Sequence, residues 1–119
     1  MIKALVVDDE IDICILLKEQ LQKLGFQTHY SLRIKEASEK LATTSFDLVF
    51  ADLNLPDGSG FDLIHSLRAT DKKVKIVIIS AYEAERQKVL DVGANLYVAK
   101  PFTGKTILAA LKELKFIEN

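Results

Sequence analysis

Five polar side chains that could do chemistry stand at the ends of short apolar runs: Asp8, Asp9, Asp52, Ser80 and Lys100. If the fold gathers them, three carboxylates repel one another, by about 1 kcal/mol per pair at about 4 Å in water and several times that near a protein surface. One lysine leaves an excess of negative charge, which a hard divalent cation can neutralise. Oxygen-only ligands favour Mg²⁺, which keeps several waters and holds a phosphate. The residue types therefore predict a magnesium site that handles a phosphoryl group.

Asp52 is the residue that would receive this group. A carboxylate can act as a nucleophile and form an aspartyl phosphate. Lys100 and the hydroxyl of Ser80 would then stabilise charge on the transferred oxygens. Each residue also has a simpler interpretation when taken alone. Asp52 can cap the turn that follows it, and Lys100 can be a solvated surface charge.

The elements that must position these residues alternate between strand and helix. Short apolar runs predict strands over residues 4–7, 27–30, 47–52, 75–80 and 96–99. Apolar residues at helical spacing predict helices over residues 10–24, 33–42, 61–67 and 83–92, and around Ile107, Leu111 and Leu114. This alternation predicts an α/β fold with a doubly wound parallel sheet and helices on both faces. Because parallel strands end at the same edge, the five side chains should converge there.

Two of the expected elements are weaker than the rest. Residues 27–30 are polar and few, which is typical of a strand at a sheet edge. Residues 83–92 carry charged or amide side chains at most positions and leave few apolar ones to pack. We expect this helix to be the least firmly held.

The composition fits an ordinary globular protein. A chain of 119 residues with 49% hydrophobic and 28% charged residues fits one domain, expected over 1–119. The net charge of −1 gives no electrostatic case for binding nucleic acid or an anionic membrane. The single cysteine, Cys14, cannot form an internal disulfide, which favours a reducing compartment. No apolar stretch approaches the roughly 20 residues that cross a bilayer, and no secretion signal is evident, so we expect a cytoplasmic protein.

The sequence resembles the receiver domain of two-component response regulators over essentially its whole length, and is similar to single-domain chemotaxis-type regulators. The matching segments are Val6-Val7-Asp8-Asp9-Glu10, residues 47–52 followed by Leu55-Pro56-Asp57-Gly58, Ile78-Ile79-Ser80-Ala81, and residues 93–102. The resemblance implies a flavodoxin-like sheet of five parallel strands in the order 2-1-3-4-5, with five helices in three layers.

The resemblance also implies a role for each site residue. Asp52 would take a phosphoryl group from a phosphohistidine on a sensor histidine kinase or a histidine phosphotransfer protein. Asp9, Asp52 and the backbone carbonyl of Asn54 would bind Mg²⁺ directly, and Asp8 would bind it through water. Lys100 would bind the phosphoryl group, and the Lys100–Pro101 peptide bond would be cis.

A conformational switch is the further implication. Ser80 would move toward the phosphate, and Tyr97 would turn inward into the space released. The surface of the helix over 83–92, the strand over 96–99 and the last helix would then control a downstream effector or a fused output domain, with a phosphorylation-linked dimer as one form. Asn54 and Tyr82 would border the path of a hydrolytic water and tune the lifetime of the phosphate in opposite directions.

Three other functions are compatible with parts of the pattern. Residues 99–106 follow a strand and open a helix, as in a P-loop nucleotidase, but Ala99 replaces the first glycine of that motif. A phosphatase with Asp52 as its nucleophile would need a nearby general acid, and Asn54 cannot serve as one. A pseudo-receiver would bind partners without phosphorylation. ATP binding would favour the first alternative, and phosphorylation by a small phosphodonor without nucleotide would argue against it.

Overall fold

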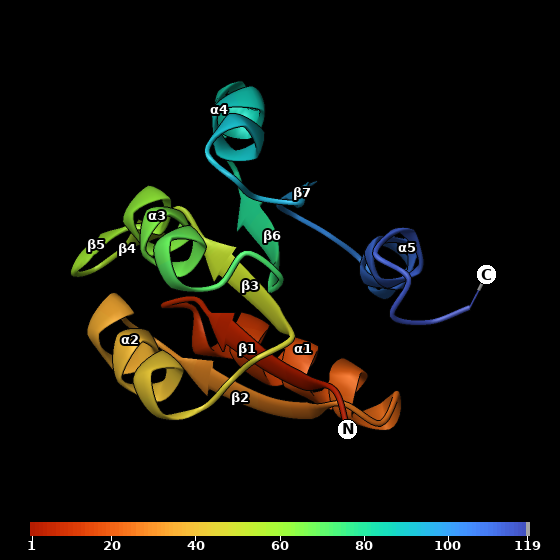
Figure 1. Ribbon diagram of the computed structural model, residues 1–119. Helices are drawn as coiled ribbons and strands as arrows, with labels where there is room; N and C mark the ends of the chain where they lie inside the picture. The colour runs from red at the N-terminus through yellow and green to blue at the C-terminus, as the bar shows by residue number, and fades with distance from the viewer. Residues whose placement is uncertain (119) are drawn as a thin grey trace.

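A five-stranded parallel sheet forms the centre of the computed structural model, which describes residues 1–118 (Figure 1). Its strands are β1 (Lys3–Val7), β2 (Gln27–Ser31), β3 (Leu48–Asp52), β6 (Lys75–Ser80) and β7 (Leu96–Ala99), and their order is β2-β1-β3-β6-β7. All four pairings are parallel. This confirms the predicted order 2-1-3-4-5 and places the polar segment of residues 27–31 at an edge.

Helices cover both faces of the sheet, because alternate strand residues point to opposite sides. Leu5, Val7 and their neighbours pack against α2 (Ile34–Thr43), α3 (Gly60–Thr70) and α4 (Arg86–Asp91). Ala4 and Val6 point to the other face, where α1 (Ile11–Lys23) and α5 (Gly104–Glu113) lie. The three-layer α/β/α architecture is therefore the predicted one. No helix within residues 1–118 is long and apolar enough to span a membrane.

The expected helix over 83–92 is shorter and less regular than predicted. It begins with a 3₁₀ turn, η1 (Glu83–Glu85), and α4 itself has 6 residues, of which Val89 alone is buried. The charged side chains of this segment stay in solvent, so few contacts hold it against the sheet. That this is the least firmly held helix stays a prediction.

A small hairpin follows β3 where the sequence predicts a turn. It pairs β4 (Asn54–Leu55) with β5 (Gly58–Ser59). Gly60 allows the chain to return, because a Cβ there would lie 2.5 Å from the backbone oxygen of Asp52. The hairpin is therefore pressed against the end of β3.

The hairpin also supplies caps to two helices. Ser59 accepts a hydrogen bond from the backbone N–H of Phe61 and caps α3. Helix α2 has no side-chain cap of its own, and Asp57 supplies one from the hairpin by accepting from the N–H groups of Ile34 and Lys35 at 2.8 and 3.0 Å. These bonds lower the pKa of the Asp57 carboxyl. The segment after Asp52 is thus fixed at both ends.

Candidate functional site

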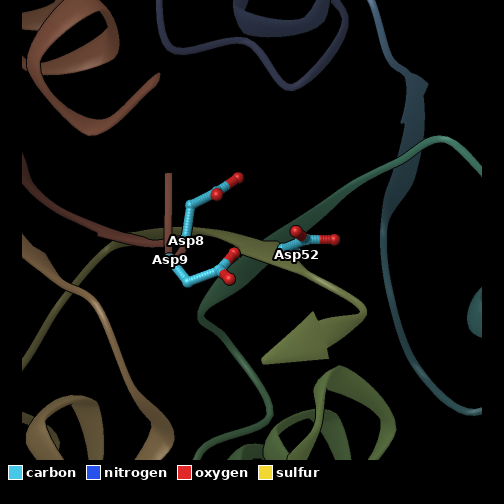
Figure 2. Close-up of side chains that lie close together, drawn as sticks. All are labelled: Asp8, Asp9 and Asp52. Carbon is cyan, nitrogen blue, oxygen red and sulfur yellow. The ribbon is translucent and has the colours of Figure 1, made fainter. Parts of the chain in front are cut away.

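The polar residues at the strand ends converge at one edge of the sheet, as predicted. Asp8 and Asp9 follow β1, Asp52 ends β3, Ser80 ends β6, and Lys100 follows β7. Figure 2 shows the three carboxylates pointing into the same region. One oxygen from each lies within 4.8 Å of the others. The parallel register creates this acidic pocket, since it brings the carboxyl ends of separate strands together.

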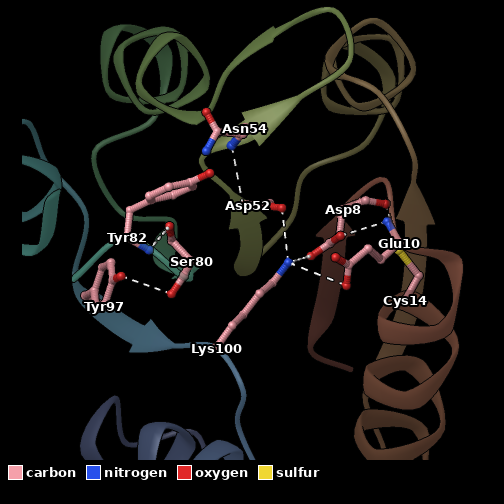
Figure 3. A network of polar contacts seen from close by, with 9 residues as sticks. All are labelled: Asp8, Glu10, Cys14, Asp52, Asn54, Ser80, Tyr82, Tyr97 and Lys100. Atoms are coloured by element: carbon pink, nitrogen blue, oxygen red, sulfur yellow. Dashed lines mark hydrogen bonds and ion pairs between the residues drawn. The ribbon is translucent and has the colours of Figure 1, made fainter. Parts of the chain in front are cut away.

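Lys100 lies between two of these carboxylates (Figure 3). Its ammonium nitrogen is 3.0 Å from Oδ2 of Asp8 and 3.1 Å from Oδ2 of Asp52, and the latter contact is a hydrogen bond. The side chains of Lys100, Asp8 and Asp52 are only 15%, 2% and 12% exposed. A fourth carboxylate, that of Glu10, approaches the same nitrogen at 3.9 Å. Glu10 belongs to the matching segment after β1 but was not among the predicted site residues. The Lys100–Pro101 peptide bond is cis, as the resemblance implies.

Burial and charge oppose each other at this ion cluster. Burial raises the pKa of Asp8 above its ordinary value, although a hydrogen bond from the backbone N–H of Glu10 and the nearby Lys100 act in the other direction. Burial alone would lower the pKa of Lys100, but the contacts with Asp8 and Asp52 outweigh it and raise that pKa. Lys100 therefore stays charged, while the buried Asp8 is only partly compensated.

The donor set fits a hard divalent cation. Oδ2 of Asp8 is fully buried and has no partner with hydrogen-bond geometry, since its 3.0 Å contact with Lys100 is an ion pair without suitable angles. Such an oxygen is costly unless a cation compensates it. Asp8, Asp9 and Asp52 bring three negative charges, and Lys100 brings one positive charge. Oxygen ligands with excess negative charge suit Mg²⁺.

Ser80 and Tyr97 are joined at the base of the pocket. Ser80 is fully buried, and its hydroxyl accepts a hydrogen bond from the backbone N–H of Tyr82 at 3.0 Å. The hydroxyl of Tyr97 donates to the backbone oxygen of Ser80 at 3.0 Å, and the Tyr97 ring is buried (Figure 3). The same oxygen accepts from the backbone N–H of Lys100 at 2.9 Å. Tyr97 thus lies in the inward position in this structure.

The two residues expected to tune phosphate lifetime lie at one hollow beside the pocket. Asn54 and Tyr82 both line this hollow, whose volume is about 270 Å³. The backbone N–H of Asn54 donates to Oδ1 of Asp52 at 3.4 Å, and Tyr82 is 58% exposed. Glu85, which is not among the predicted site residues, lines the same hollow. Asn54 and Tyr82 therefore both lie near Asp52.

Two further contacts at the site were not predicted. Cys14 is buried in α1, and its thiol donates to the backbone oxygen of Asp8 at 3.2 Å. Burial raises the pKa of this thiol to about 12, so it stays protonated. At α4, on the opposite face of the sheet from α1, the guanidinium of Arg86 lies over the ring of Tyr97. Neither contact has a sequence pattern of its own, because each depends on how a helix packs on the sheet.

Comparison with known proteins defines the family. The family model of the response regulator receiver domain matches residues 4–112, and the chain belongs to this family. Receiver domains pair with histidine kinases. The match confirms the resemblance found in the sequence and leaves the P-loop alternative without support. The acidic pocket of Asp8, Asp9 and Asp52 is consistent with Mg²⁺ binding in a receiver domain.

Individual relatives agree with this assignment. The chemotaxis response regulator CheY4 of Vibrio cholerae is 29% identical, with a TM-score of 0.89 over 96% of this chain and 98% of that one. The response regulator TrrA from Thermotoga maritima, solved in complex with Mg²⁺-BeF, is 34% identical, with a TM-score of 0.86 over 96% and 99% of the two chains. The response regulator protein PilR of Pseudomonas aeruginosa is 38% identical over 114 residues, which are 94% of this chain and 25% of PilR. The chain spans half or less of the length of the curated relatives it matches.

Proposed function

We propose that this protein is a phosphorylation-dependent signalling switch, with residues 1–119 as one receiver domain and Asp52 as its phosphoacceptor. The observation that carries the proposal is the position of Lys100, whose ammonium group bridges Asp52 and the buried Asp8 at 3.1 and 3.0 Å. This places a fixed cation beside the carboxylate that would react. Electrostatic stabilisation by such a preorganised group is a large contribution to phosphoryl transfer.

The proposed reaction follows from these positions. An oxygen of Asp52 attacks the phosphorus of a phosphohistidine, the phosphorus–nitrogen bond breaks, and its electron pair returns to the imidazole nitrogen. Lys100 then exchanges its contact with Asp52 for one with a transferred oxygen, and the hydroxyl of Ser80 turns to donate to another. Asp8, Asp9, Asp52 and the backbone carbonyl of Asn54 would hold Mg²⁺, which neutralises charge on the phosphoryl oxygens when bound.

The phosphoryl group would leave by hydrolysis at the same site. Water attacks the phosphorus, the bond between phosphorus and the Asp52 oxygen breaks, and the Asp52 carboxylate is regenerated. Inorganic phosphate leaves with the hydroxyl of the water, and the other proton of the water passes to solvent. The hollow lined by Asn54 and Tyr82, which Leu53 next to Asp52 also lines, would give this water a route. The amide of Asn54 would help to orient the water, and the ring of Tyr82 would obstruct it. We propose that these two residues set the lifetime of the phosphate.

The partners follow from the family and from the weakly held α4. The phosphodonor would be a sensor histidine kinase or a histidine phosphotransfer protein. The surface of α4, β7 and α5 would control an effector or a fused output domain, and a phosphorylation-linked dimer is one form of that output. Shifting a two-state element from mostly off to mostly on takes about 5.5 kcal/mol. Two or three charge-assisted hydrogen bonds to a phosphate are of this order.

The test is Mg²⁺-dependent phosphorylation of Asp52. The protein is incubated with acetyl phosphate, with and without a chelator, and its intact mass is measured. We expect the mass of one phosphoryl group to be added only when Mg²⁺ is present, and not in Asp52→Asn. Asp62→Asn, an exposed change in α3, is the matched control and should be phosphorylated normally. Phosphorylation of Asp52→Asn, or of wild type in chelator, would contradict the proposal.

A further inference from the structure

Arg86 connects the exposed face of α4 to the buried ring of Tyr97. It is the first residue of α4, and its guanidinium carbon lies 4.7 Å from the centre of the Tyr97 ring. Its Nε atom donates to Oε1 of Glu83 at 2.6 Å, in an ion pair one helical turn away. The guanidinium therefore has one anchor on η1 and one aromatic face beneath it.

Tyr97 continues this line of contacts into the acidic pocket. Its hydroxyl donates to the backbone oxygen of Ser80 (Figure 3). That oxygen also accepts from the backbone N–H of Lys100. The contacts of Arg86, Tyr97 and Ser80 thus join the surface of α4 to the backbone of Lys100, the residue whose ammonium contacts Asp52. Removal of the Arg86 guanidinium frees one face of the Tyr97 ring, while the hydrogen bond from the Tyr97 hydroxyl to Ser80 remains.

The strength of the Arg86 contact decides how much it matters. A guanidinium over an aromatic ring is attracted by the electron-rich face, and stacking suits its flat shape. The Arg86 side chain is 46% exposed, which places the contact in the weaker class of such interactions. A cation–π contact of that class changes the ratio of inward to outward Tyr97 by about two- to fivefold. The contact biases the position of the ring but does not lock it.

We propose that Arg86, anchored by Glu83, is a positioning residue that holds Tyr97 inward and thereby couples the α4 surface to the phosphoacceptor site. The coupling to phosphorylation rests on the proposed function, whereas the effect on Tyr97 does not. A partner that draws Arg86 away from the ring would release Tyr97, and a phosphoryl group that favours inward Tyr97 would strengthen the Arg86 contact by the same factor. Through Arg86, the α4 surface thus responds to whether the acidic pocket is phosphorylated.

The test measures how readily Tyr97 is reached from solvent. Tetranitromethane nitrates accessible tyrosines, and peptide mass spectrometry gives a separate rate for each ring. Tyr82, being largely exposed, is the internal reference. We expect Arg86→Ala to raise the nitration rate of Tyr97 relative to Tyr82 by about two- to fivefold. Arg86→Lys, which keeps the charge but not the flat stacking group, should give an intermediate rate.

Two more variants separate this contact from a general loosening of the helix. Glu83→Gln should raise the nitration rate of Tyr97 less than Arg86→Ala, because it removes only the anchor of Arg86. Lys88→Ala removes another exposed cation of α4, which is 3.9 Å from Glu85, and should leave Tyr97 unchanged. Circular dichroism checks that each variant is folded. An unchanged rate in Arg86→Ala, or an equal rise in Lys88→Ala, would overturn the proposal.

The link to phosphorylation has its own measurement. Acetyl phosphate with Mg²⁺ should slow nitration of Tyr97 in Arg86→Ala, and Asp52→Asn should abolish this protection. If wild type gains no phosphoryl group while Arg86→Ala still exposes Tyr97, the proposed function fails and the role of Arg86 in positioning Tyr97 is upheld. If wild type is phosphorylated and Tyr97 in Arg86→Ala gains no protection, the coupling is refuted.

Discussion

Lys100→Met is the change that tests the electrostatics of the pocket most directly. Methionine keeps most of the apolar stem of the lysine and removes its charge. Each contact with Asp8 and Asp52, at 3.0 and 3.1 Å, has a gross attraction of about 5 kcal/mol at an effective dielectric constant of about 20. Loss of one partner of a buried ion pair typically costs about 3–5 kcal/mol. We expect the lower end, because burial already raises the pKa of Asp8 and the carboxyl can take up a proton.

The assay is thermal unfolding with chelator and with Mg²⁺. A loss of about 3 kcal/mol lowers Tm by roughly 12 °C in a domain of this size, so Lys100→Met should still fold but melt early in chelator. Mg²⁺ should recover most of this loss and should raise Tm more than in wild type, because the acidic pocket then lacks the ammonium that competes with the cation. Lys105→Met, an exposed change in α5, should behave as wild type. Wild-type stability of Lys100→Met in chelator, or equal Mg²⁺ effects in both proteins, would refute the reasoning.

Two changes, Asp57→Ala in the hairpin after β3 and Gly60→Ala at the start of α3, test how the segment after Asp52 is held. Gly60→Ala should destabilise the protein by about 1–3 kcal/mol, because its Cβ would lie 2.5 Å from a backbone oxygen. Denaturant unfolding measures this loss of stability. Gly58→Ala should lose less stability, because its Cβ would meet only the movable end of the Ile34 side chain. Asp57→Ala should lower Tm at neutral pH, because α2 loses its cap. The pKa of Asp57 is lowered in the folded protein, so its stabilisation is present above the ordinary value of 3.8 and is lost as the pH falls through the lower folded value. The Tm difference from wild type should therefore vanish in acid, and a difference that persists there would contradict the assignment of the cap to the carboxylate.

The sheet and the pocket could be predicted from the sequence because both depend on local patterns. Strands β3 and β6 are buried on both faces, so they read as continuous apolar runs, and the polar residue that ends each run marks the sheet edge. The parallel order then brings Asp52 and Ser80 to the same side without further information. The charged composition of residues 83–92 likewise agrees with a helix that buries only Val89.

The contacts that could not be predicted join elements that only the tertiary fold brings together. Asp57 caps a helix that begins 23 residues earlier in the chain, and no local spacing marks that pair. Arg86 reads in the sequence as one more charge on a polar helix. Its place over Tyr97 depends on how the start of α4 lies against β7. Glu10 approaches Lys100 only because β1 and β7 end at the same edge.

In the proposed reaction Lys100 contacts first the carboxylate of Asp52 and then a phosphoryl oxygen. In the structure Lys100 neutralises Asp8 and Asp52, and these contacts keep its pKa raised, so it remains a cation. In the proposed phosphorylated protein it would keep Asp8 and exchange the Asp52 carboxylate for a phosphoryl oxygen. One charge-assisted contact then replaces another of similar strength, so the movement of the ammonium has little net cost. The stabilisation available for the switch must therefore come from contacts that phosphorylation adds, and Ser80 is the residue with a hydroxyl free to change partners, because its present donor is a single backbone N–H.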